Sequence, residues 1–443
     1  MRLALGFALI GSALNIAVAT AAPILLGPVP GLDPNQLRIT TFASSLGFIY
    51  GLARADDGSL LAGVSGQPLF GGGTAQVLRF VDANFDGIAD GPGTAVIGGI
   101  PGIITAVQRV GALLAVGTLS ETSTSSRVSL FAPGATPDAP YTLVGQLDFA
   151  FGRFWSHASP GLAARATPGG PAGSFDLFVN VGSATNNTIS GPLTVSGLGL
   201  SNVSVPGDSI FLFRLDTSAA SPTSAPPERI AAGIRNAVAM GFHPATGDFY
   251  FADNGIDGLI NPDEPTSADE LNRIAAASLG QGTLDFGFPN SYVTYRTGVI
   301  VGGGIQPVVA FQPLGDPFTG SESEGPAGLA FSPSLFPNAI AHGVFVGFHG
   351  RGCCGLANEE NPVVYVDLGT GNYYHFLSND DPNVAHINSF LSTNDSLFLA
   401  DFGGGNIYQV SSVPEPATCT LMATAIVLLA ALKRKKAQLS RFR

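Results

Sequence analysis

Oxygen-bearing side chains alternate in one short acidic stretch, and their spacing suits a divalent cation. Asp82, Asn84, Asp86 and Asp90 fall at positions one, three, five and nine of a loop, with Gly87 at position six. This spacing is typical of calcium loops, in which the glycine permits a sharp turn. Position twelve is a glycine rather than the glutamate that normally supplies two oxygens. The stretch is therefore interpreted either as a calcium loop of reduced affinity or as a turn held by Asx hydrogen bonds.

Further polar residues gather after apolar strands in the second half of the chain. Segments 233–236, 253–258, 269–272 and 286–289 read Gly-Ile-Arg-Asn, Asp-Asn-Gly-Ile-Asp-Gly, Asp-Glu-Leu-Asn and Phe-Gly-Phe-Pro. The acidic residues among them form a second, looser candidate for a metal site. The sequence contains no Gly-rich phosphate loop at a strand–helix junction, no Cys/His zinc spacing and no Gly-x-Ser-x-Gly elbow. These patterns therefore give no support to phosphate-loop, zinc or serine-hydrolase chemistry.

The elements that must position these residues are short strands in a repeated unit. A strand that follows a turn and ends in small residues recurs six times, and a second apolar strand follows each copy. The first strand of the pair lies at 57–64, 110–117, 174–182, 246–253, 342–348 and 394–401. The second lies at 77–82, 128–131, 210–216, 271–274, 363–367 and 407–410.

This repeat predicts an all-β fold, namely a six-bladed β-propeller. Helical periodicity never lasts beyond two or three turns, and the 58 glycines and 32 prolines indicate many turns. Residues 37–42 are predicted to pair with the last blade and to close the ring, which removes an exposed sheet edge. A pair of β-sandwiches is the competing architecture.

The polar segments and the blade repeat together resemble the soluble quinoprotein glucose/sorbosone dehydrogenase family, whose members are six-bladed propellers. In that family an Arg-Asn pair opens one blade, and an Asp-Glu-Leu-Asn-like element and a Tyr-Gly-Trp-Pro-like turn follow. The resemblance implies oxidation of a sugar hydroxyl with pyrroloquinoline quinone (PQQ). A histidine would take the hydroxyl proton, while an arginine and a calcium ion would stabilise the developing charge.

The same resemblance assigns site residues in this chain. They are His157 as the base, Arg235 beside the quinone, Asn236 at substrate or cofactor, Arg351 on the same axis and Glu270 at a metal. The chain departs from the family pattern at Ser183, where an acidic residue is common. It also lacks, between its two ends, the lysine that commonly helps to hold the quinone. The alternative interpretation is that these polar residues simply satisfy one another in the central channel.

Charge is distributed unevenly along the chain. The 443 residues carry a net charge of −12, yet all three lysines lie within 433–436. The remaining body is lysine-free and acidic, so it repels phosphate backbones and is expected not to bind nucleic acid. An acidic body is compatible with calcium.

The two ends carry the signs of export. Residues 1–21 are interpreted as a signal peptide, with Arg2 before an apolar run and Ala19-Thr20-Ala21 at the cleavage site. Residues 22–412 form the predicted propeller. Residues 413–443 read as a tail: Val413-Pro414-Glu415-Pro416, a single apolar helix at 417–432 that would cross a membrane, and a basic cluster.

The order of these three tail parts resembles the PEP-CTERM sorting signal of Gram-negative bacteria. The resemblance implies transient anchoring in the inner membrane and cleavage by an exosortase. The product would then reach the cell surface, the outer membrane or an extracellular polysaccharide matrix. Two functions follow as hypotheses: a PQQ-dependent sugar dehydrogenase, or a non-catalytic, calcium-stabilised propeller that binds polysaccharide or protein in the matrix.

Overall fold

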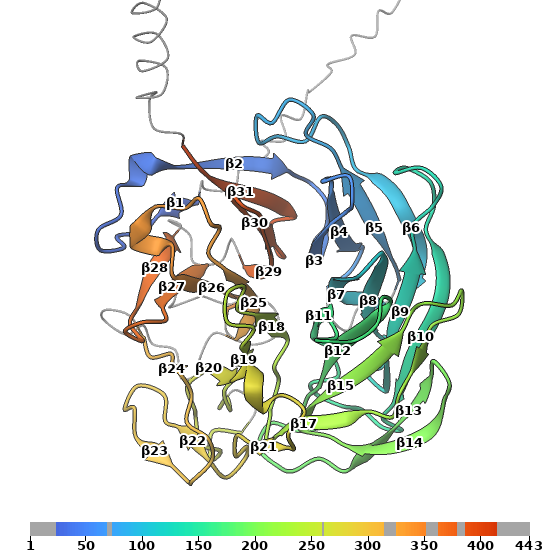
Figure 1. Ribbon diagram of the computed structural model, residues 1–443. Coiled ribbons are helices and arrows are strands. Elements are labelled where there is room, and N and C mark those ends of the chain that lie inside the picture. Colours follow the sequence, from blue (N-terminus) through green and yellow to red (C-terminus); the bar gives the residue numbers. More distant parts are fainter. Residues whose placement is uncertain are drawn as a thin grey trace, which may run out of the picture.

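Six small sheets stand around a central axis in the computed structural model, which describes residues 24–68, 73–258, 261–313, 325–350, 362–378 and 386–413 (Figure 1). The first blade holds β3 (Phe48–Arg54), β4 (Leu60–Ser65), β5 (Thr74–Phe80) and β6 (Thr94–Pro101). The second holds β7 (Ile103–Val110), β8 (Leu113–Leu119), β9 (Ser125–Ala132) and β10 (Thr142–Ala150), extended by β13 (Pro192–Gly197) and β14 (Leu200–Pro206). The third holds β11 (Leu162–Ala166), β12 (Ser174–Val181), β15 (Ser209–Asp216) and β17 (Glu228–Ala232), with β16 (Thr223–Ser224) and β21 (Leu284–Asp285).

The other three blades complete the ring. The fourth holds β18 (Ala239–Phe242), β19 (Phe249–Asp253), β20 (Glu270–Ile274) and β24 (Val309–Ala310). The fifth holds β25 (Pro326–Phe331), β26 (Gly343–Phe348), β27 (Val363–Asp367), β28 (Tyr373–Ser378) and β1 (Leu25–Leu26). The sixth holds β29 (Ile387–Ser392), β30 (Ser396–Asp401), β31 (Asn406–Ser412) and β2 (Leu37–Ala43). A small hairpin, β22 (Tyr292–Val293) and β23 (Ile300–Val301), and the 3-10 turns η1 (Pro34–Gln36), η2 (Ala276–Ser278) and η3 (Asn338–Ile340) lie outside the blades.

The predicted six-bladed, all-β propeller is confirmed, and the pair of sandwiches is wrong. The six copies of the first predicted strand are β4, β8, β12, β19, β26 and β30, which are the second strands of the six blades. The six following strands are β5, β9, β15, β20, β27 and β31, the third strand of each blade. The sequence repeat therefore marks the middle of each sheet.

The middle strands are nearly continuous apolar runs because both faces of each blade are covered by neighbouring blades. Every residue of β4 and of β26 is buried. Aromatic rings join adjacent blades: Phe178 of β12 stacks on Phe249 of β19 with ring centroids 4.9 Å apart. Burial on both faces explains why these strands read as apolar blocks rather than as alternating patterns.

The ring is closed by the N-terminal part of the described chain. β2 pairs antiparallel with β31, from Leu37 opposite Ser412 to Ala43 opposite Ile407. This is the closure predicted for residues 37–42. A second contact comes from β1, which adds to the outer edge of β28 in the fifth blade. β2 therefore covers the edge of β31 and becomes the outermost strand of the sixth blade, as expected for a closed propeller.

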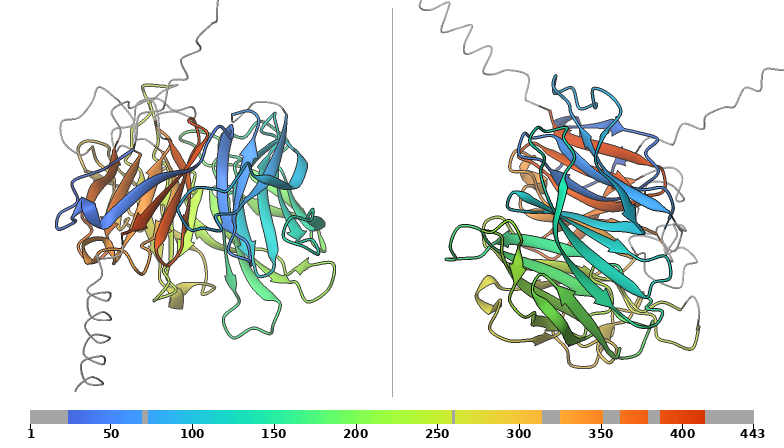
Figure 2. Two further views of the ribbon diagram at one scale, coloured as in Figure 1. Left: turned by 90° about the horizontal axis from the view of Figure 1, so that it is seen from above. Right: turned by 90° about the vertical axis from the view of Figure 1, so that its right-hand side faces the viewer.

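Strand direction divides the molecule into two faces. Neighbouring strands of the blades are antiparallel, except that β21 pairs parallel with β17 at the edge of the third blade. The innermost strands are β3, β7, β11, β18, β25 and β29, which line a channel cavity of about 90 Å³. We name the face where these inner strands begin the N face and the face where they end the C face; Figure 2 shows the ring from two further directions. Segments that join second to third strands therefore lie at the N face, and segments that join third to fourth strands lie at the C face.

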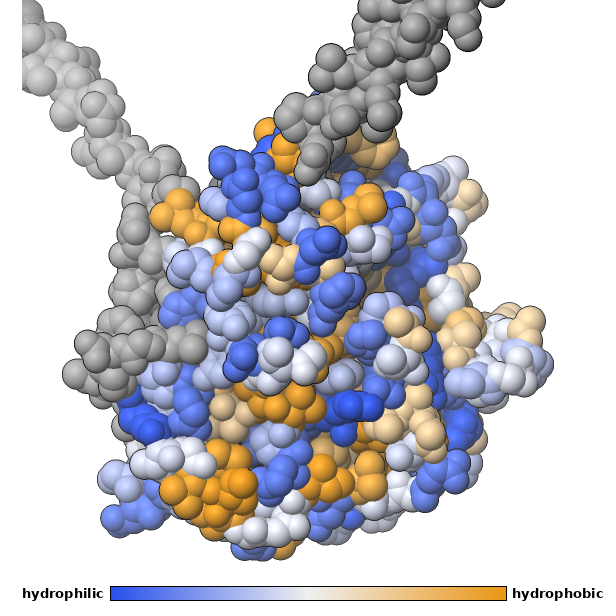
Figure 3. Space-filling view, turned by 60° about the vertical axis from the view of Figure 1, so that its left-hand side comes forward, coloured by the Kyte–Doolittle hydropathy of each residue, from blue (hydrophilic) through white to orange (hydrophobic). Residues whose placement is uncertain are grey.

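Several sequence-based predictions concern residues outside the described ranges. They include the signal peptide, the sorting tail beyond Val413, and Arg351. Within the described ranges, no helix is long and apolar enough to cross a bilayer. On the surface presented in Figure 3, apolar patches are separated by hydrophilic residues.

Candidate functional site

The turn that carries His157 is built at the N face, between β10 and β11. The indole of Trp155 is fully buried, stacks on Phe151 with ring centroids 4.9 Å apart, and donates its Nε1–H to the Gly182 carbonyl at 2.8 Å. The backbone N–H of His157 donates to the Ser183 carbonyl at 3.0 Å. The end of β12 therefore fixes the position of the His157 backbone.

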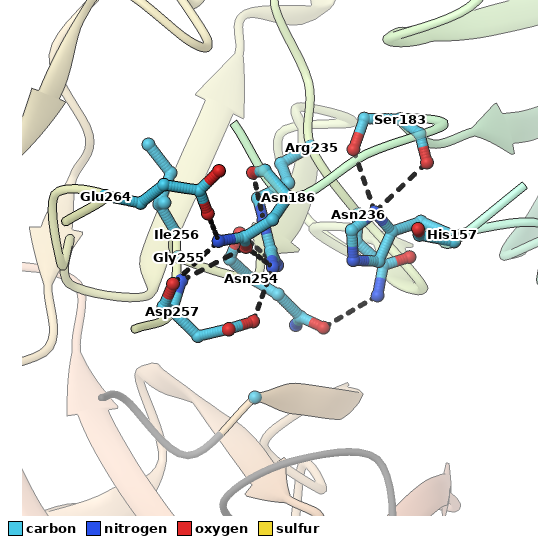
Figure 4. Close-up of polar contacts among 12 residues, drawn as sticks. His157, Ser183, Asn186, Arg235, Asn236, Asn254, Gly255, Ile256, Asp257 and Glu264 are labelled. Atoms are coloured by element: carbon cyan, nitrogen blue, oxygen red, sulfur yellow. Dashed lines mark hydrogen bonds and ion pairs between the residues drawn. The ribbon is translucent and has the colours of Figure 1, made fainter. Parts of the chain in front are cut away.

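The imidazole of His157 is held through one ring nitrogen. Its Nδ1 lies 2.8 Å from Oγ of Ser183 and 3.1 Å from the Ser183 carbonyl oxygen (Figure 4). The Ser183 hydroxyl donates its own hydrogen to the Thr185 carbonyl at 2.5 Å. Both Ser183 oxygens are therefore acceptors toward the ring, so Nδ1 carries the hydrogen and Nε2 keeps a lone pair.

Burial lowers the pKa of His157 well below its usual value, and the positive charge of Arg235 lowers it further. The hydrogen bond to the Ser183 carbonyl acts in the opposite direction. The imidazole is consequently neutral near pH 7, and its Nε2 can accept a proton.

Arg235 lies between the third and fourth blades in a network of its own (Figure 4). Its guanidinium pairs with the Asp257 carboxylate at 2.7 Å, donates from Nε to the Asn186 carbonyl at 3.0 Å, and donates from Nη2 to Oδ1 of Asn186. The Asn186 side-chain amide donates to the Asp257 carbonyl at 2.6 Å and to the Glu264 carboxylate. Asn186 thereby ties the segment after β12 to the segment after β19.

Asn236 is placed by the neighbouring carboxylate of Asp253. The backbone N–H groups of Arg235 and Asn236 donate to the two oxygens of Asp253 at 3.0 and 2.5 Å. The side-chain amide of Asn236 donates to Oδ1 of Asn254 at 2.7 Å. Its Oδ1 is buried and has no hydrogen-bond partner in the described part of the chain. Burial raises the pKa of Asp253 to about 6 in spite of these donors.

Glu270 begins β20 beside two other carboxylates. Burial, with the nearby charges of Asp253 and Asp269, raises its pKa to about 8. Asp269 accepts from the backbone N–H groups of Gly255 at 2.7 Å and Gly325 at 2.8 Å. Among the described residues, no group of three or more His, Cys, Asp or Glu side chains is arranged to hold a metal. The metal role of Glu270 therefore stays a prediction.

The acidic loop 82–90 lies on the opposite, C face, between β5 and β6. The Asp82 carboxylate accepts from the backbone N–H groups of Asp86 and Gly87 at 3.2 and 3.0 Å. Oδ1 of Asn84 accepts from Asp86 at 3.1 Å, and the Asp90 carboxylate accepts from Ala83 at 2.7 Å. The structure thus shows the Asx-bonded turn, in which Gly87 has a φ of 87°. Calcium at Asp82, Asn84, Asp86 and Asp90 stays a prediction.

The structure brings His157, Arg235, Asn236 and Glu270 to the N face and leaves the acidic loop at the other end of the channel. It also adds two histidines that the sequence did not single out. His349 follows β26 and His386 precedes β29, so both lie at the N face. Burial lowers the pKa of His349 to about 4, and the charges of His386 and Arg235 contribute. Each histidine lies at the end of a blade strand, and this position is the sequence feature that could have singled them out.

Comparison with solved structures supports the fold. The chain is similar to the holo form of the pyranose dehydrogenase PQQ domain from Coprinopsis cinerea, with a TM-score of 0.56 and 14% identity over 88% of this chain and 97% of that one. It is similar to the calcium structure of a Trichoderma reesei family AA12 carbohydrate-active enzyme, with a TM-score of 0.55 and 15% identity over 88% and 98%. A glucose dehydrogenase matches with a TM-score of 0.50 and 15% identity over 85% and 100%.

These structural neighbours thus include a PQQ domain and a glucose dehydrogenase, and at such low identity they show the fold alone, a six-bladed propeller. No family model matches the chain. An uncharacterised protein of Borreliella burgdorferi is 30% identical over 204 residues, which cover 41% of this chain and 48% of that protein. The match thus spans about half the length of this curated relative.

Proposed function

We propose that this protein is a PQQ-dependent sugar dehydrogenase with its site at the N face of the propeller. The observation that carries the proposal is the hydrogen bonding of His157. Ser183 fixes the hydrogen at Nδ1 and leaves the Nε2 lone pair to take a proton. A lowered pKa keeps that nitrogen unprotonated at neutral pH. A neutral, oriented imidazole is what removal of a proton from a sugar hydroxyl requires.

The fit of the neighbouring residues to PQQ rests on two unused polar groups. Oδ1 of Asn236 is buried without a partner in the described residues, and Nη1 of Arg235 has only a long contact, 3.5 Å to the Asn254 carbonyl. These two residues would hold the cofactor, together with Arg351 as the family resemblance suggests. When bound, PQQ supplies the two-electron oxidant that accepts the hydride from the sugar carbon. Nε2 of His157 takes the hydroxyl proton, and the sugar carbon becomes a carbonyl.

Reconstitution of the purified protein with PQQ and calcium tests the proposal. An absorbance change of the bound cofactor on addition of aldoses is expected, and His157→Ala should abolish it. His243→Ala is the matched control, because His243 lies in a turn on the C face, where its Nδ1 accepts from the Thr246 backbone N–H at 3.1 Å. Absence of PQQ binding at micromolar protein would contradict the proposal, and so would an equal loss of activity in both variants.

One observation favours a second candidate function, a non-catalytic propeller that binds polysaccharide or protein. The guanidinium of Arg235 is already neutralised by Asp257 and occupied by Asn186, as a structural tie between blades would be. The two functions are separated by Arg235→Lys in the reconstitution assay. A catalytic role predicts weaker PQQ binding at unchanged folding, whereas a purely structural role predicts a lower melting temperature and no cofactor binding in either protein.

The proposal includes export. The apolar N-terminal run, the Pro-Glu-Pro motif and the basic C-terminal cluster support delivery through the inner membrane, processing by an exosortase and residence at the cell surface, outer membrane or extracellular matrix of a Gram-negative bacterium. Cell fractionation tests this. Replacement of Pro414 and Pro416 by alanine should retain the uncleaved chain in the inner membrane, while surface delivery of that variant would contradict the sorting role.

A further inference from the structure

Two hollows adjoin on the C face, the end of the channel opposite His157. One, of about 350 Å³, lies between the first and sixth blades, and the other, of about 560 Å³, lies over the channel mouth. Arg54, Leu391 and Thr393 line both of them, so the two hollows meet along these residues. Together they form one groove, which we call the C-face groove.

The C-face groove holds two arginines that have no partner side chain within the described residues. In the described residues, the other arginines form an ion pair with a carboxylate, lie over an aromatic ring, or, in Arg229, donate to a serine hydroxyl. Arg38 and Arg54 have none of these contacts there. Among the residues that the structure describes, Arg54 makes only a 3.4 Å hydrogen bond to the Gly58 carbonyl. In an acidic protein these two guanidiniums are free to receive an anion, and both line the smaller hollow.

The rest of the wall is mixed in character. Phe85 is 86% exposed at its rim, and Phe242 and Phe331 line the larger hollow. Gln409 lines the smaller hollow, and its Oε1 is buried without a partner in the described part of the chain. Serine and threonine hydroxyls complete the wall. Apolar rings beside a few polar acceptors and donors are what a site for a polar small molecule needs.

Carboxylates select between possible anions. Asp82 and Asp395 line the same hollow as the two arginines. A phosphodiester group offers these carboxylates no hydrogen-bond donor, whereas a uronate ring can pair its carboxylate with a guanidinium and donate its hydroxyls to the aspartates. We propose that the C-face groove binds a carboxylated sugar, that is, a uronate unit of a polysaccharide. This site is separate from the N face and does not depend on PQQ chemistry.

Calorimetry on the full-length protein with trigalacturonate tests the proposal. A chelator is present throughout, so that calcium bridging at loop 82–90 cannot contribute. We expect binding of the acid, and at least tenfold weaker binding of its fully methyl-esterified form. Arg38→Gln and Arg54→Gln should each weaken binding of the acid by at least tenfold. Arg127→Gln is the control, because that exposed arginine pairs with Asp148 on the second blade.

Three results would overturn the proposal: no binding of trigalacturonate, equal affinity for acid and ester, or affinities of the two groove variants equal to that of the Arg127 variant. Tighter binding of a thymidine oligonucleotide than of trigalacturonate would show instead that the groove takes phosphate chains. If Arg54→Gln lowers the melting temperature, Arg54→Lys replaces it. The lysine keeps the charge but not the two-pronged hydrogen bonding, and should still weaken binding.

Discussion

Nδ1 of His157 lies 2.8 Å from the hydroxyl oxygen of Ser183, so a neutral group orients this imidazole. A carboxylate at the same place would stabilise the protonated ring, but a hydroxyl does so only weakly. The charged group that acts on His157 is Arg235, which disfavours protonation. The Ser183 hydroxyl therefore sets the tautomer of His157 without raising its pKa.

This relationship predicts the pH dependence of activity. In the reconstituted protein, the acid limb of kcat/KM should lie below the usual histidine pKa of 6.5, because His157 must be unprotonated to act and its pKa is lowered. Ser183→Asp should move that limb to higher pH by roughly one unit. Ser183→Ala should shift it little, since the Ser183 carbonyl still accepts from Nδ1. Coincident profiles of the Asp variant and the unsubstituted protein would contradict this role of Ser183.

Glu270 predicts how stability changes with pH. Its folded pKa of about 8 lies above the ordinary 4.5, so ionising Glu270 costs folding free energy. The penalty is absent below pH 4.5, grows between pH 4.5 and about 8, and is constant at higher pH. The unfolding free energy of Glu270→Gln should therefore fall less between pH 5 and pH 8 than that of the unsubstituted protein. The unfolding free energy of Glu270→Gln should still fall somewhat near pH 5 to 6, because Asp253 also has a raised pKa, of about 6. Denaturant titrations check this, with the exposed Glu121→Gln as the control that should keep the full slope.

The tie between Arg235 and Asp257 predicts a stability difference between two ion pairs. The Arg235 side chain is 6% exposed, so Asp257→Ala leaves a buried cation without its carboxylate and should destabilise the fold by about 3 kcal/mol. Asp148→Ala breaks the more exposed pair with Arg127 and should cost less than about 1 kcal/mol. If chemical denaturation shows that Asp257→Ala and Asp148→Ala lose the same unfolding free energy, the buried Arg235 does not need its carboxylate partner.

Calcium provides a test of the acidic loop. If loop 82–90 binds calcium, the melting temperature should rise with added Ca²⁺, because a ligand that binds the folded state stabilises it. Asp86→Ala should abolish that rise, and Asp138→Ala, an exposed carboxylate paired with Arg79, should preserve it. If added calcium does not change the melting temperature of the unsubstituted protein, the loop is only a turn held by Asx hydrogen bonds.

The blade architecture could be predicted because each second strand is covered on both faces. The apolar segment that forms β26, for example, has no exposed residue. Its unbroken apolar sequence therefore predicts a strand that is buried on both faces. The hairpin β13–β14 could not be predicted in the same way. It leaves the third blade after β12 and pairs with β10 of the second, at Leu147 opposite Gly197 through Ala150 opposite Thr194. Such long-range pairing depends on geometry that no local pattern encodes.

The candidate site was predictable only in part, for a related reason. His157 and Arg235 stand out by residue type and by their places before the strands β11 and β18. Ser183, Asn186 and Asp257 are ordinary loop residues, and their roles follow from which loops meet at the N face. Asn186 and Asp257 are far apart in the chain, and only the packing of the third blade against the fourth brings the amide of one to the carbonyl of the other.

The ring closure has a mechanical consequence. Because β2 and β31 run antiparallel, with Leu37 opposite Ser412, the chain enters one strand and leaves the other at the same end of the pair. Tension applied at those two points would load the hydrogen bonds one after another, as in a zipper, rather than all at once in shear. The β2–β31 pair should therefore open at a lower force when it is pulled at Leu37 and Ser412 than when its two strands are sheared past each other.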